Sequence, residues 1–144
     1  MSGLAFIRPD DWNLPLFVHI LGAMVLVGAL ALVLVALAGR DMRLGYRSLL
    51  LGVLPGWIVM RGAAEWIAEK EHVNDIKPEP DWVGIGYSIA DPMLLLIIIA
   101  TVCSGIAVRR QRTGGGLRGT ALVLTSIMLV AAFVAVWAMT TKPT

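Results

Sequence analysis

Four long apolar runs dominate the chain, and short polar stretches separate them. The runs cover about residues 15–38, 48–68, 83–108 and 120–140. About 20 helical residues, at 1.5 Å each, cross a hydrocarbon core of about 30 Å, and each run is at least about that long. The lipid interior holds no water to form hydrogen bonds with backbone N–H and C=O groups, so these groups must pair with one another and the runs are expected to be helices. The pattern predicts an all-α membrane protein, a four-transmembrane-helix bundle forming a single domain over residues 1–144.

Prolines and acidic residues refine this picture. Pro55 and Pro92 lie inside the second and third runs, where a proline removes a backbone hydrogen bond and favours a kink. Asp10 and Asp11 precede the first run, where a cleavable signal peptide would carry positive charge. The first run is therefore expected to be a retained membrane helix.

The charges between the runs predict the orientation of the helices. Arginines gather after the first and third runs, at Arg40, Arg43, Arg47, Arg109, Arg110, Arg112 and Arg118. The positive-inside rule places these segments in the cytoplasm. Tryptophans mark the opposite helix ends and predict an interfacial belt, at Trp12, Trp66, Trp82 and Trp137. We expect a multi-pass protein of the bacterial cytoplasmic (inner) membrane with both termini outside.

Composition narrows the possible functions. The chain is 58% hydrophobic and 15% charged, whereas a soluble domain carries about 25% charged residues. The net charge is +2 and the basic residues sit in loops, so we expect no nucleic-acid partner. Cys103 is the single cysteine, which excludes an intramolecular disulfide. Hydrolase and nucleotide-binding motifs are missing, which leaves the question of an enzyme open and a redox role possible.

Four ionisable residues interrupt the apolar runs at similar depth. They are His19, Arg61, Glu65 and Asp91, expected roughly 5–12 Å inside the outer helix ends at 1.5 Å per residue. Arg61 and Glu65 share one helix face, as do Tyr87 and Asp91, because each pair is spaced i,i+4. Ionisable groups in a bilayer are costly and usually functional. We expect these residues to converge on one site, in which Arg61 pairs with both carboxylates.

Several hypotheses account for this cluster. In the first, His19 binds haem b or copper for electron or proton transfer, with Met139 as a second ligand. Arg61 would then balance a propionate, Glu65 and Asp91 would tune charge, and Tyr87 would lie nearby. In the second, a homo-oligomer transports ions or couples transport to protons. In the third, the chain is an accessory subunit or assembly factor of a larger membrane complex. The cluster is also compatible with a purely structural ion network.

Sequence resemblance adds one expectation. The segment FVHILGAMVLVGALAL is similar to the first helix of small bacterial membrane proteins of the copper-resistance D and SirB-like groups. The segments PGWIVMRGAAEWIAEKE and VWAMTTKP resemble those of uncharacterised actinobacterial four-helix proteins. The resemblance implies a four-helix architecture and a metal or haem role for His19. This chain departs from those groups because its apolar runs hold no second histidine.

Overall fold

A computed structural model of the chain describes residues 14–70, 81–111 and 115–140. Its elements are α1 (Leu14–Ala38), α2 (Met42–Ser48), the π-helix η1 (Leu49–Val53), α3 (Leu54–Lys70), α4 (Asp81–Arg109) and α5 (Gly116–Thr140). The elements α2, η1 and α3 follow one another without a break, so the described residues form four long helical stretches. All four are long and apolar enough to cross a membrane. The prediction of an all-α, four-helix chain is confirmed at this level.

The second stretch begins at Met42 rather than near Ser48. Asp41 explains the earlier start, because its side chain accepts a hydrogen bond of 2.9 Å from the backbone N–H of Leu44 and caps α2. The stretch widens into η1 directly before Pro55. Since a proline lacks an N–H and clashes with the preceding turn, regular α-helical pairing cannot continue there unaltered.

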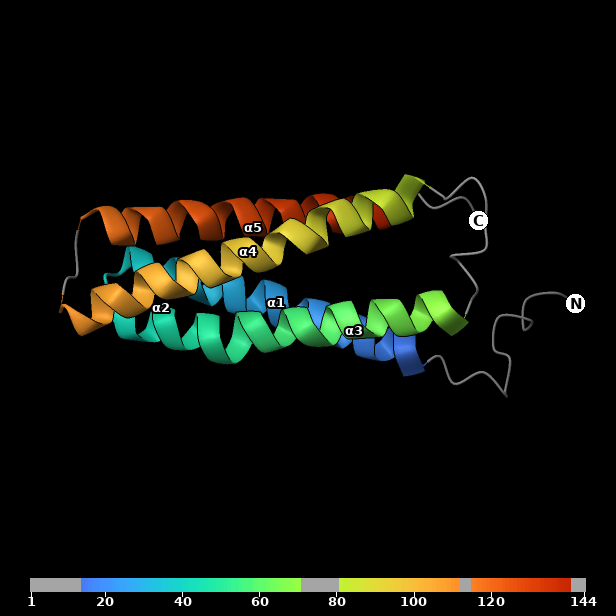
Figure 1. The fold of residues 1–144 in the computed structure, drawn as a ribbon, viewed down its shortest axis with the longest axis horizontal. Coiled ribbons are helices and arrows are strands. Elements are labelled where there is room, and N and C mark those ends of the chain that lie inside the picture. The colour runs from blue at the N-terminus through green and yellow to red at the C-terminus, as the bar shows by residue number, and fades with distance from the viewer. Residues whose placement is uncertain (1–13, 71–80, 112–114, 141–144) are drawn as a thin grey trace, which may run out of the picture.

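The helices form two antiparallel pairs, α1 with α3 and α4 with α5 (Figure 1). The helix α1 also packs against α2 and α5, so it holds a central place. The helix α4 crosses the bundle obliquely, from a start beside α5 to an end near α2 (Figure 1). Its backbone therefore lies apart from that of α3 at the end of the bundle where α1 begins and α5 ends, and side chains of Ala68 and Val83 pack together there. This divergence leaves room for the site described below.

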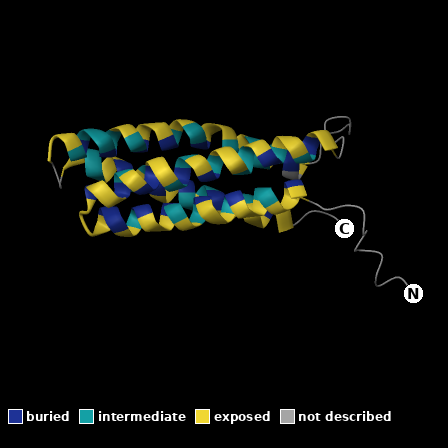
Figure 2. Ribbon diagram, turned by 90° about the horizontal axis from the view of Figure 1, so that it is seen from below, coloured by how far each residue is buried: buried dark blue, intermediate teal, exposed yellow. Residues whose placement is uncertain are grey.

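One face of α1 supplies the centre of the core. Leu26, Leu30, Val33 and Leu37 recur at helical spacing, and all four are fully buried. They pack in one cluster with Leu49 and Val53 of η1, Met93 and Ile97 of α4, and Met128 of α5. Figure 2 shows buried residues facing inward and exposed ones covering the outside. Many exposed residues are large and apolar, including Val35 (70% exposed), Leu51 (73%) and Phe133 (59%).

Two glycines allow the backbones of α1 and α3 to touch. A Cβ atom on Gly22 would lie 2.6 Å from the backbone nitrogen of Met60, and one on Gly56 would lie 2.9 Å from that of Leu26. Small residues at such crossings let membrane helices approach closely. The contact at Gly22 also fixes the height at which His19, one turn earlier on α1, faces α3.

Candidate functional site

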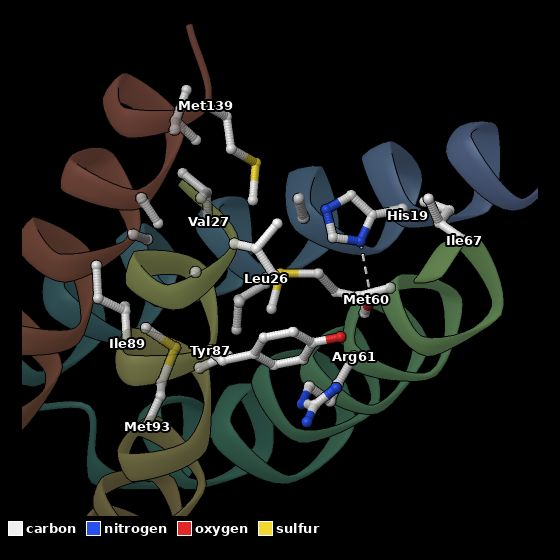
Figure 3. A pocket seen from close by; sticks show the side chains of 18 of the residues that line it. His19, Leu26, Val27, Met60, Arg61, Ile67, Tyr87, Ile89, Met93 and Met139 are labelled. Atoms are coloured by element: carbon white, nitrogen blue, oxygen red, sulfur yellow. Dashed lines mark hydrogen bonds between the residues drawn. The ribbon is translucent and has the colours of Figure 1, made fainter. Parts of the chain in front are cut away.

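A cavity of about 370 Å³ opens where α4 diverges from α3. All four long helical stretches contribute to its wall, which consists mostly of alanine and larger apolar side chains (Figure 3). The polar side chains in the wall are His19 from α1, Arg61 from α3 and Tyr87 from α4. An apolar cavity of this volume with few polar groups is typical of a small-molecule site.

His19 is held in one orientation by α3. Its Nδ1 atom lies 2.9 Å from the backbone oxygen of Met60. A carbonyl oxygen only accepts hydrogen bonds, so Nδ1 is the donor, and in the neutral tautomer that makes this bond it carries the ring's one N–H proton. The other ring nitrogen, Nε2, then keeps a free lone pair, and it faces the cavity (Figure 3). A histidine prepared to bind a metal through Nε2 commonly has this arrangement.

Methionine thioethers face the same space as His19. Met139 of α5 lines the cavity, and its methyl group lies 3.8 Å from the place where a Cβ on Gly86 of α4 would be. Met60 and Met93 also line the cavity (Figure 3). Thioether sulfur is a soft ligand that suits copper(I) and haem iron. The cavity thus combines one imidazole with three sulfur atoms.

Arg61 links α3 to α4 at the edge of the cavity. Its Nε donates to Oδ1 of Asp91 over 3.1 Å, and its Nη1 forms an ion pair with Glu65 one turn away. The guanidinium carbon also lies 4.5 Å from the centroid of the Tyr87 ring, within the range of a cation–π contact. The predicted pairing of Arg61 with both carboxylates is therefore present.

The two carboxylates lie outside the cavity. The side chains of Glu65 and Asp91 are 48% and 60% exposed, that of Arg61 is 21% exposed, and neither carboxylate lines the wall. His19 bonds to a backbone oxygen instead of a charged group. The expected single cluster is thus divided into an inner part, with His19 and Met139, and an outer ion network, with Arg61 and Tyr87 between them.

Sequence reasoning missed two contributors to this region. Met60 orients His19 through its backbone oxygen, a group that every residue has and that no sequence pattern reveals. Trp57 donates from Nε1 to the backbone oxygen of Ala90 over 2.9 Å and so joins α3 to α4. Its place inside an apolar run, away from the other tryptophans, was a signal that it has a partner within the bundle.

Comparison with known proteins found no matching family model, no matching curated protein and no matching solved structure. The resemblance to the copper-resistance D and SirB-like groups therefore stays a prediction. In the described part of the chain, no group of three or more His, Cys, Asp or Glu residues is placed to hold a metal ion. A metal at this site would be coordinated by His19 together with methionine sulfur, or by His19 and a porphyrin.

Proposed function

We propose that the chain spans the bacterial inner membrane four times, with its arginine-rich end inside and both termini outside. The exposed apolar surface supports insertion, because soluble monomers rarely expose large continuous apolar patches. The exposed side chains of Trp66 and Trp137 mark an interface at the opposite end from the arginines, and the arginines support the orientation. Asp10, Asp11, Trp12, Arg112 and the side chain of Trp82 lie outside what the structure describes.

The proposed insertion places the charged rim of the site close to the outer boundary of the hydrocarbon core. The helix α4 has 29 residues, or about 44 Å, so it is longer than a hydrocarbon core of about 30 Å. Measured from the arginine-rich end at 1.5 Å per residue, Asp91 lies about 27 Å from Arg109 and His19 about 29 Å from Ala38. Counted in this way, Asp91 and His19 lie closer to the outer membrane surface than when their depth is counted inward from the outer helix ends. The shallow position explains how an exposed aspartate is tolerated there.

We propose that the cavity binds haem b and that the protein takes part in electron transfer. The observation that carries the proposal is His19, whose Nδ1 is fixed by Met60 while Nε2 faces an apolar cavity with Met139 on another wall. Haem, when bound, supplies one-electron chemistry, and a His/Met ligand pair raises its reduction potential. The apolar wall fits a porphyrin face, and the charged rim fits its propionates.

The chain's own residues have distinct tasks in this proposal. The carbonyl of Met60 keeps His19 in one tautomer and holds the ring so that Nε2 faces the cavity. Arg61 offers a guanidinium fork to a propionate, in partial exchange for Glu65 or Asp91. The surrounding apolar side chains exclude water from the ligand, which strengthens each polar contact inside.

Copper(I) is a second candidate, favoured by one observation. Three thioethers, from Met60, Met93 and Met139, line the same cavity as His19. Soft sulfur ligands select copper(I) over harder metals. Haem and copper are distinguished by colour, because copper(I) bound to imidazole and thioethers gives no Soret band.

The absorption spectrum of the purified, detergent-solubilised protein tests the proposal, recorded in air and after dithionite. We expect a Soret band and a reduced α-band that His19→Ala abolishes. Met139→Leu should retain haem with a lower reduction potential, whereas Met128→Leu should leave the spectrum unchanged. Met128 is a matched control because it lies on the same helix, fully buried and away from the cavity wall.

The outcomes separate the candidates. A colourless protein with about one copper per chain, lost in His19→Ala, would replace haem by copper. A protein without colour and without copper would refute both and return the transport and accessory-subunit hypotheses to first place.

A further inference from the structure

A second cavity, of about 390 Å³, lies at the opposite end of the bundle. The turn after α1 and the first turn of α2 form one side, and the end of α4 with the residues just after it forms the other. Its wall includes Arg40, Asp41 and Arg43 from the first side and Gln111 from the second. Unlike the apolar cavity near His19, this one is lined largely by charged and polar side chains.

Two guanidinium groups in this wall have no carboxylate partner among the residues that the structure describes. The ion pairs among the described residues involve Arg61 alone, so Arg40 and Arg43 have none there. Asp41 lies between them in the sequence, but its carboxylate accepts from Leu44 and caps α2. Arg118, also at this end, is engaged with the backbone oxygens at the end of α1. With two arginines and one aspartate, the wall of the cavity carries a net charge of +1.

The backbone places two of these residues in an unfavourable conformation. Arg40 has φ 64° and Gln111 has φ 51°, in the left-handed region that L-residues other than glycine rarely adopt. Each follows a helix, at a position where glycine is the usual residue. Both residues line the same cavity. The left-handed turn ends each helix with a backbone hydrogen bond, from the N–H of Arg40 to the oxygen of Leu37 and from the N–H of Gln111 to that of Val108.

We propose that this cavity binds a phosphate group through Arg40 and Arg43, with Gln111 as a further hydrogen-bond donor. A planar guanidinium matches phosphate oxygens with two parallel hydrogen bonds. The phosphate belongs to an anionic phospholipid of the inner leaflet or to a soluble phosphate ester. The lipid source rests on the proposed membrane insertion, which puts this end at the inner headgroups. The binding chemistry is independent of the ligand near His19.

Native mass spectrometry of the full chain in non-ionic detergent tests the site, with phosphatidylglycerol as the probe. Arg40→Gln and Arg43→Gln should each weaken binding by about tenfold or more, the effect of losing a hydrogen bond to a charged group. Arg47→Gln is the matched control, since Arg47 lies on α2 and is exposed like Arg40 and Arg43 but lies outside the cavity. It should weaken binding by less than about fivefold, the scale of a diffuse surface contribution.

Glycerol phosphate, added as a competitor, distinguishes the sources. Displacement of the lipid would show that the cavity recognises the phosphate itself and accepts soluble esters. If glycerol phosphate does not displace the lipid, the cavity is specific for the phospholipid. Equal losses in Arg47→Gln and Arg43→Gln, or unchanged binding in both cavity variants, would overturn the proposal. His19→Ala should retain lipid binding, so failure of the haem proposal remains a separate result.

Arg40→Gly guards against a folding artefact. Glycine adopts φ 64° without strain, so this variant should be at least as thermally stable as the wild type. It should nevertheless bind phosphatidylglycerol about tenfold more weakly or worse. A stable Arg40→Gly protein that binds as tightly as the wild type would show that the arginine has no part in a phosphate site.

Discussion

The crossing of α1 and α3 gives the sharpest prediction, through Gly22→Ala. The new Cβ would lie 2.6 Å from the backbone nitrogen and 2.9 Å from the Cα of Met60. Both are backbone atoms, so no change of side-chain conformation relieves the contact, and the helices must separate. Because Met60 is also the residue that orients His19, the separation should disturb the ligand site together with the fold.

The magnitude follows from two opposing effects. Overpacking a close contact costs about 1–3 kcal/mol, and two backbone contacts this short point to the upper end. Alanine is more favourable than glycine within a helix by about 1 kcal/mol. We therefore expect a net destabilisation of about 2 kcal/mol, which for a chain of this size lowers the melting temperature by about 4–8 °C.

Size-exclusion chromatography after stepwise heating in detergent measures this change. Gly28→Ala is the matched control, because Gly28 lies on the same helix as Gly22 and a Cβ there would meet no atom within 4 Å. We expect Gly28→Ala to be as stable as the wild type or more so. If Gly22→Ala melts at the temperature of Gly28→Ala and leaves the absorption spectrum intact, the close crossing of α1 and α3 is wrong.

Three further predictions address the two ends of the bundle. Arg118→Gln should cost about 1–2 kcal/mol, measured by the same heating assay, because Arg118 donates over 2.7 and 3.3 Å to the last carbonyls of α1. Asp91→Asn should cost less than about 1 kcal/mol, because its side chain is 60% exposed; a larger loss would make the ion network mainly structural. With Cys103 replaced by serine, an impermeant maleimide added outside intact cells should label Lys70→Cys and spare Gly116→Cys. Labelling of both would refute the proposed topology.

The sequence by itself determined the number and approximate extent of the helices. Apolar runs of about 20 residues allow few alternatives to helices, since unpaired backbone groups in lipid cost several kcal/mol each. It also determined the pairing of Arg61 with Glu65, because residues spaced i,i+4 meet on any helix. Local geometry alone fixes both features. The start of the second stretch was missed because the cap at Asp41 lies in a segment that reads as a basic loop.

Only the tertiary structure decided how the polar residues divide between a cavity and its rim. Helical spacing shows which side chains share a face, whereas the crossing of α1 over Gly22 and the oblique path of α4 decide which faces meet. Those crossings direct His19 toward the Met60 backbone and into the cavity, and they leave Asp91 outside it. A backbone acceptor and a helix crossing angle depend on contacts between distant segments, so no local pattern in the sequence encodes them.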